Sequence, residues 1–149
     1  MRIFWLRCLV GAALLAAAVP CGAVDEQFSF YGLQFGMTKA ETGRIVTLEG
    51  NTARNPGHGM ISLELVFDRE ELLMEIRAGW PRPEEALEYQ GFLRALREKF
   101  VAPTNSRFPT VAVTLDEYSN RAAIQVHFLS TGIREKNIEF HKNRFLKTL

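Results

Sequence analysis

The chemistry that this 149-residue chain could perform centres on its three histidines. His127 and His141 lie in two short alternating segments. If Phe128 pairs with Ile138 in an antiparallel sheet, Glu139 faces His127, and zinc accepts two imidazoles and a carboxylate as ligands. No HExxH-type spacing accompanies the group. We therefore expect an ordinary polar sheet face and no metal site there.

His58 offers a second kind of chemistry, because a histidine can activate a serine when an acid orients it. The chain has no Gly-x-Ser-x-Gly elbow, and the nearest serine, Ser62, falls in a predicted strand. Asp116 and Glu117 are adjacent, so in a strand they point to opposite faces and cannot form an acid–base pair. We expect no catalytic residue and no cofactor. The alternative is a small periplasmic hydrolase or metal-binding protein that uses His58 or the His127 group.

The first residues have the pattern of a secretory signal peptide. Arg2 and Arg7 precede an unbroken apolar run over 9–19, and small residues follow at 20–23. The apolar run is about half of the roughly 20 residues that a membrane-spanning helix needs. We predict a signal peptide over residues 1–23 and a single domain over 24–149.

The two cysteines, Cys8 and Cys21, would both leave with this signal peptide. The remaining chain would then have no thiol for a disulfide, a metal or a nucleophile. An alternative is lipidation of Cys21, although Pro20 directly before it departs from the usual lipoprotein sequence. The localisation we expect is periplasmic or secreted, with lipid anchoring through Cys21 as the alternative.

Charge is distributed unevenly along the chain. Residues 24–88 hold 12 acids and 6 bases, whereas residues 89–149 hold 5 acids and 10 bases. The near-neutral total argues against a nucleic-acid partner. The basic C-terminal segment could meet an acidic protein or a membrane surface, or could simply guard a sheet edge with lysines.

The first half of the domain is expected to contain one strand, one helix and one hairpin. A loose alternation predicts an edge strand over 28–35, ending at Gly36. Thr38 and Glu41 have the spacing of a capping box, which predicts a helix over 39–48. A loop over 49–60 follows, and then a hairpin of 61–67 with 72–78 whose register pairs Phe67 with Leu72.

The second half is expected to contain one long helix and three strands. Pro83 suits a first helical turn, and four apolar residues follow at helical spacing: Tyr89, Leu93, Leu96 and Phe100. Alternation predicts strands near 111–115, 124–128 and 138–140. The fold class is therefore α+β, with two helices packed on one face of an antiparallel sheet of five to six strands. The order is strand, helix, hairpin, helix and three strands.

The segment Gly36-Met37-Thr38-Lys39-Ala40-Glu41 resembles the opening of small secreted bacterial domains. One such group is the outer-membrane assembly lipoproteins of the SmpA/OmlA type, and another is the β-lactamase-inhibitor-like domains. The resemblance covers about fifteen residues and departs from the pattern at Thr42 and Gly43. It implies helices on one face of an antiparallel sheet and a role in protein–protein contact without catalysis.

We therefore expect a secreted, periplasmic module that binds another envelope protein. It would act as an assembly helper or as an inhibitor of an envelope enzyme. The 49–60 loop and the basic C-terminus are the candidate contact elements, and Trp80 is a candidate aromatic anchor. The candidate binding residues are Asn55, His58, Trp80, Lys142 and Arg144. Oligomeric state is left open.

Overall fold

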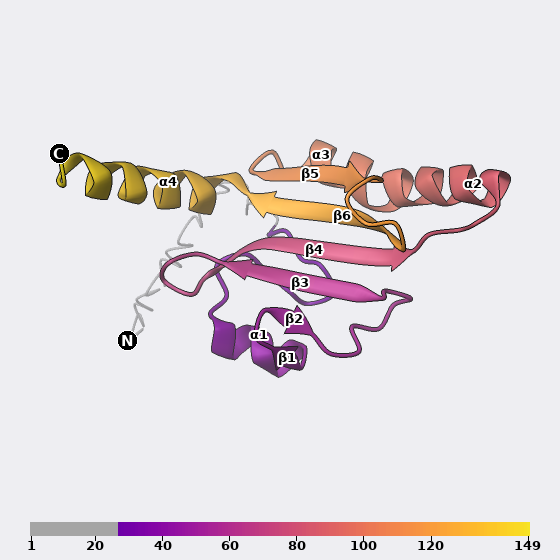
Figure 1. Cartoon of the computed structure of the whole chain (residues 1–149), viewed down its shortest axis with the longest axis horizontal. Coiled ribbons are helices and arrows are strands. Elements are labelled where there is room, and N and C mark those ends of the chain that lie inside the picture. The colour runs from indigo at the N-terminus through magenta and orange to yellow at the C-terminus, as the bar shows by residue number, and fades with distance from the viewer. Residues whose placement is uncertain (1–26) are drawn as a thin grey trace, which may run out of the picture.

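The computed structural model describes residues 27–149, which fold around one antiparallel sheet with the strand order β1-β2-β3-β4-β6-β5 (Figure 1). The strands are β1 (Leu48–Glu49), β2 (Thr52–Ala53), β3 (Ser62–Phe67), β4 (Leu73–Pro81), β5 (Val111–Asp116) and β6 (Ala123–Ser130). The helices are α1 (Lys39–Ile45), α2 (Ala86–Leu96), the π-helical η1 (Arg97–Val101), α3 (Ala102–Arg107) and α4 (Thr131–Leu146). The α+β class, with helices packed against an antiparallel sheet, is confirmed. The expected signal peptide and Cys21 lie outside the described residues.

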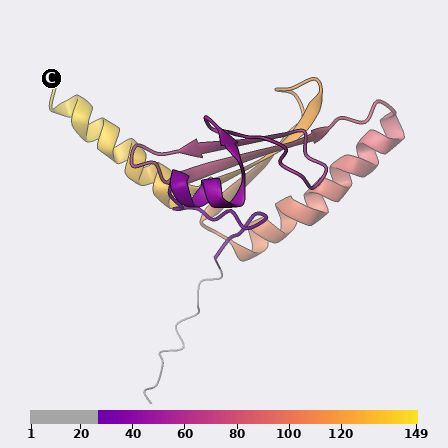
Figure 2. The same ribbon diagram turned by 90° about the horizontal axis from the view of Figure 1, so that it is seen from below.

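One face of the sheet is the core face. Leu65, Ile76 and Phe128 form one row across β3, β4 and β6, and all three side chains are fully buried. The elements α2, η1 and α3 run as one long helix below the sheet (Figure 2). The predicted apolar stripe of this helix is confirmed, because Leu93 and Leu96 are buried in the same hydrophobic cluster as the strands.

The segment 28–35 is not the edge strand that its alternation predicted. Phe30 and Leu33 exchange two backbone hydrogen bonds around a tight turn, of 2.9 and 3.0 Å. Tyr31 and Gly32 form the turn with φ of 49° and 88°. The turn drives Phe28, Phe30 and Leu33 into the core, so their apolar character reflects burial under the sheet and not strand pairing.

The capping box at the start of α1 is present as predicted. Glu41 N–H donates to Thr38 Oγ1 at 3.2 Å, and Thr38 N–H donates to Glu41 Oε2 at 2.8 Å. This second bond lowers the pKa of the Glu41 carboxyl. The helix ends at Ile45, earlier than the predicted residue 48, because Leu48–Glu49 and Thr52–Ala53 form a short hairpin that spans the predicted helix end and the start of the predicted loop.

The β3–β4 hairpin forms, but its predicted register is wrong. Phe67 pairs with Leu73, and Leu65 pairs with Ile76. Asp68 Oδ1 accepts hydrogen bonds from the N–H groups of Glu70 and Leu72, which lengthens the turn by one residue. A bulge beside Phe67 then restores the alternation, so Leu73 is buried in place of Leu72.

The third C-terminal strand, predicted around 138–140, is a helix. Ser130 caps α4, since its hydroxyl accepts from the N–H of Ile133 at 3.5 Å. The signal for this helix was the spacing of Ile133, Asn137 and Phe140, which places all three on one helical face. The short alternation of Ile138 with Phe140 was a false strand signal. Strands β5 and β6 are present as predicted.

Candidate functional site

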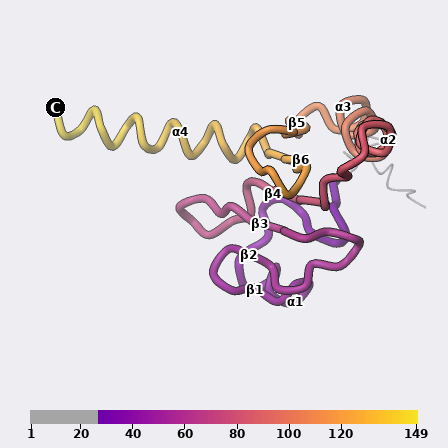
Figure 3. Tube along the Cα trace, turned by 45° about the vertical axis from the view of Figure 1, so that its right-hand side comes forward, coloured from indigo at the N-terminus to yellow at the C-terminus, as the bar shows by residue number. Residues whose placement is uncertain are grey.

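Helix α4 leaves the body of the molecule directly from the end of β6. Figure 1 and Figure 3 both show it extending away from the sheet. Its first half contacts the β3–β4 turn: the Arg69 guanidinium lies 3.4 Å from the centre of the Phe140 ring. Ile133 and Asn137 line a small cavity of about 180 Å³ against the same turn. This contact fixes the direction in which the rest of the helix points.

The second half of α4, residues 141–149, is exposed along its whole length. We call this segment the distal helix, although its last residues lie beyond the helix end at Leu146. It carries Lys142, Arg144 and Lys147 and no acidic residue. Its apolar side chains are also in solvent, with Phe145 exposed by 64% and Leu149 by 88%. Basic and apolar groups are therefore both presented for contact on one projecting element.

Two exposed apolar residues of α4 share one side of the helix. Ile138 and Phe145 are seven positions apart, which is about two helical turns. Ile138 is exposed by 53%. Lys142 lies four positions after Ile138 and so interrupts the same stripe with a charge. The surface thus pairs apolar contacts with a cation at its centre.

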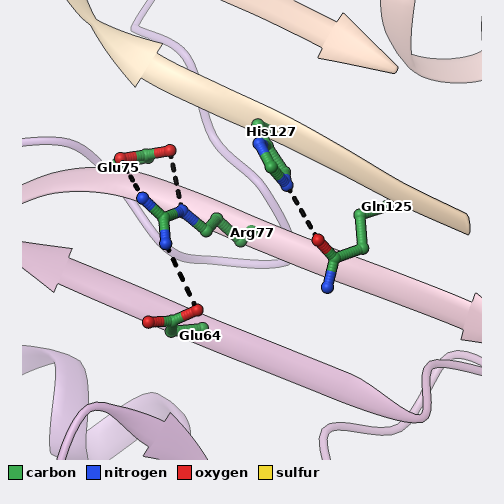
Figure 4. Close-up of polar contacts among 5 residues, drawn as sticks. All are labelled: Glu64, Glu75, Arg77, Gln125 and His127. Atoms are coloured by element: carbon green, nitrogen blue, oxygen red, sulfur yellow. Dashed lines mark hydrogen bonds and ion pairs between the residues drawn. The ribbon is translucent and has the colours of Figure 1, made fainter. Parts of the chain in front are cut away.

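The sheet face opposite the core is polar, and Figure 4 shows its central residues. Glu64, Arg77 and His127 are paired across β3, β4 and β6 in one row. Arg77 Nε donates to Glu75 Oε1 at 2.9 Å, and its Nη1 lies 3.5 Å from Glu64 Oε2. The hydrogen bond to Glu75 raises the pKa of Arg77. Arg77 is thus paired with both carboxylates, as is usual on a sheet face that meets solvent.

His127 takes part in that polar face and not in a metal cluster. Its Nε2 lies 3.0 Å from Gln125 Oε1. Because residues 138–140 are helical, Glu139 and His141 do not pair with β6, and the strand pairing that the cluster required does not exist. Within residues 27–149, no three His, Cys, Asp or Glu side chains are grouped so that they could hold a metal ion.

The 54–60 loop brings two of the predicted binding residues together. The Trp80 Nε1–H donates to the carbonyl of His58 at 3.1 Å, and the His58 ring stacks on Tyr31 with centroids 3.7 Å apart. Asn55 and His58 both have positive φ, of 50° and 53°. Trp80 itself is only 7% exposed, so its indole holds the loop in place from within the core.

The other predicted binding residues, Lys142 and Arg144, lie on the distal helix. In Figure 1 the loop between β2 and β3 lies below the sheet, far from the tip of α4 at the far left. The five predicted residues therefore form two separate groups. A Ser–His pair is also absent from the loop, because Ser62 Oγ is buried without a hydrogen-bond partner.

A polar cluster that the sequence did not reveal joins the long helix to the β5–β6 turn. Tyr89 Oη donates to Glu117 Oε1 at 2.8 Å, and this bond raises the pKa of the Tyr89 phenol. Arg82 donates to the Tyr89 hydroxyl and to the Glu117 carbonyl. Arg97 lies 3.7 Å from the other Glu117 oxygen. Glu117 is 28 residues from Tyr89 and 35 residues from Arg82 in the sequence, so no local sequence pattern predicts these pairings.

Comparisons with known proteins add no relative. No family model matches the chain, and no significant match was found among curated proteins or solved structures.

The helices of residues 27–149 include none with the length and apolar character needed to cross a membrane.

Proposed function

We propose that this protein is a non-catalytic binding module of the bacterial envelope, and that it binds an acidic protein surface through the distal helix. The observation that carries the proposal is the exposure of every residue from 141 to 149 on a helix that projects from the sheet. Isolated helices of this length are marginal in water. A partner that received the apolar stripe would give the distal helix the packing that the rest of the domain does not provide.

Charge favours an acidic partner. Lys142, Arg144 and Lys147 are concentrated at the tip, where the helix macrodipole is negative and cations are stabilised. Opposite charges on a partner would steer encounter and fix orientation. Such binding would weaken as salt rises, because exposed charges are screened.

A protein surface fits the distal helix better than a lipid surface does. Helices that lie in the membrane interface have a continuous apolar face and a separate basic face. Here Lys142 lies between Ile138 and Phe145, on the side of the helix that these two residues share. A protein can place a carboxylate opposite that lysine and apolar side chains around it, which a layer of acyl chains cannot.

The envelope location rests on the sequence. The N-terminal pattern is that of a signal peptide, and the segment 36–41 resembles small envelope domains that act through protein contact. An assembly helper and an inhibitor of an envelope enzyme both use such contacts. The distal helix favours the assembly role, because a projecting helix suits attachment to a complex more than insertion into an active-site cleft.

Site-specific photocrosslinking in the native host tests the proposal. A photoreactive amino acid replaces Phe145 in one variant and Leu87 in the control, since Leu87 lies on α2 and is even more exposed, at 88% against 64% for Phe145. We expect one discrete protein adduct from position 145 and none of that mass from position 87. An adduct of twice the chain's own mass would indicate self-association, and lipid-only adducts would indicate a membrane surface; either would overturn the proposal.

A further inference from the structure

A cavity of about 340 Å³ lies between the N-terminal segment and the end of the long helix. Its walls are aromatic, formed by Phe28, Phe30, Tyr31, Phe100, Phe108 and Phe128. We call it the aromatic cavity. Pockets for small ligands begin at about 300 Å³ and are lined mostly by apolar and aromatic side chains with a few polar groups. The aromatic cavity has both properties.

Among residues 27–149, the charged side chains that line the aromatic cavity are those of Lys99 and Arg107, and both are positive. Lys99 Nζ lies 5.3 Å from the centre of the Phe100 ring, and Arg107 Cζ lies 5.5 Å from that of Phe108. Both side chains are exposed, so they hold positive charge at the solvent side of an apolar chamber.

The backbone of the long helix is altered beside this cavity. The Ala102 N–H donates to the carbonyl of Arg97, five residues earlier, which makes η1 a π-helical turn. Pro103 accounts for the change, because proline has no N–H to donate to the Lys99 carbonyl and its ring crowds that carbonyl. Single π turns inside α-helices occur often at functional sites. Here the turn contains Lys99, which places a positive charge at the cavity, and Phe100, which forms part of the cavity wall.

The inner wall is well supported. Phe28, Phe30 and Phe100 all pack around Phe128, with ring centroids 5.1, 5.1 and 6.1 Å away. Phe128 is fully buried on β6, an interior strand of the sheet. A ligand body entering the cavity would therefore meet rings whose positions are already set by the sheet, which lowers the ordering cost of binding.

We propose that the aromatic cavity binds a small amphipathic anion, with an apolar body against the phenylalanines and a single acidic head group near the ammonium group of Lys99. This goes beyond the binding of a protein by the distal helix and does not depend on it. Two carboxylates serve as probes: naphthoate has a flat aromatic body, and laurate has a flexible acyl chain. Comparing them shows which kind of apolar body the cavity accepts.

Isothermal titration calorimetry of the purified protein with each probe tests the site. Naphthalene methanol and lauryl alcohol serve as uncharged counterparts. We expect saturable one-to-one binding of at least one carboxylate and weaker binding of its alcohol. Lys99→Gln should weaken carboxylate binding about threefold, as loss of one exposed ion pair would. Arg94→Gln, a change of one cation on the same helix outside the cavity lining, should leave the affinity unchanged.

A blocking variant separates the cavity from other apolar surfaces. Ser29 is an exposed residue of the lining, so Ser29→Trp should fill the opening without removing a core side chain. We expect it to abolish carboxylate binding while the unfolding midpoint stays near that of the wild type. The proposal is overturned if neither carboxylate binds, if the alcohols bind as tightly as the acids, or if folded Ser29→Trp binds as the wild type does.

Discussion

Thr38 accepts a hydrogen bond from a backbone N–H that the start of α1 would otherwise leave without a partner, and Asp116 does the same in the β5–β6 turn. Thr38 Oγ1 accepts from Glu41 N–H. Asp116 Oδ1 accepts from the N–H groups of Tyr118 and Ser119, both at 3.0 Å. Unpaired backbone groups are costly to leave unsatisfied. Both positions therefore allow tests by single substitution.

Thr38→Ala removes the N-cap acceptor of α1. We expect the free energy of unfolding to fall by about 1 kcal/mol, the usual cost of such a loss. Thr38→Ser keeps a hydroxyl at the same position and should retain most of the wild-type stability. Urea denaturation of the three proteins measures the difference, and equal stability of the Ala and Ser variants would contradict the role given to the capping box.

Asp116 makes stability depend on pH in acid. Hydrogen bonds from Ser119 and Tyr118 lower its pKa from 3.8 to about 2. Because the folded pKa is below the unfolded one, the unfolded chain takes up the proton first as pH falls. The stabilisation by the Asp116 carboxylate is complete above pH 3.8, the unfolded pKa, and is lost as the pH falls to about 2, the folded pKa.

Asp116→Asn tests this, since it keeps an oxygen acceptor but removes the charge. We expect the variant to be less stable than the wild type at about pH 5, and the difference to vanish near pH 2. Urea midpoints at the two pH values provide the measurement. A difference that stays constant across this range would show that the charge of Asp116 is not what stabilises the turn.

At the scale of elements, the direction of α4 depends on its contact with the β3–β4 turn. The Arg69 guanidinium lies over the Phe140 ring and joins a side chain of the turn to the helix. A cation over a ring contributes about 0.5–1 kcal/mol at an exposed site. The double-mutant cycle of Arg69→Ala and Phe140→Ala should show a coupling of that size in the opening free energy of the first half of α4.

Amide hydrogen exchange measures this opening, because it reports local unfolding separately from global unfolding. The distal helix is a built-in comparison: its amides should exchange fast in the wild type and change little in any variant. Additive effects of the two substitutions on the first half of α4 would mean that the ring and the guanidinium do not stabilise its docking.

At the scale of the whole molecule, local patterns predicted most of the fold. The capping box, the stripe of the long helix, and strands β3, β4, β5 and β6 follow from spacing within a few residues. The register of β3–β4 was missed because it depends on side-chain hydrogen bonds of Asp68 in the turn. The alternation over 28–35 predicts a strand where the structure has a buried turn, because alternation alone cannot distinguish the two.

The candidate site was harder to predict than the fold. Charge alone predicted Lys142 and Arg144 as contact residues, in a basic segment that follows the expected strand over 138–140, whereas the structure places them on a projecting helix. The aromatic cavity joins residues near 30, 100 and 128, and no local pattern brings these together. Only the three-dimensional packing of the long helix under the sheet creates it.

The central claim is that the cations of the distal helix bind an acidic protein. The most direct measurement uses the partner protein that is identified by crosslinking at position 145. Its affinity is measured for the wild type, for the variant Lys142→Glu/Arg144→Glu, and for the control variant Arg94→Glu/Arg121→Glu. The control reverses the same number of charges at exposed sites off α4. We predict that only the distal reversal weakens binding, by tenfold or more, because close like charges replace attraction with repulsion. Equal affinities for all three proteins would contradict the account.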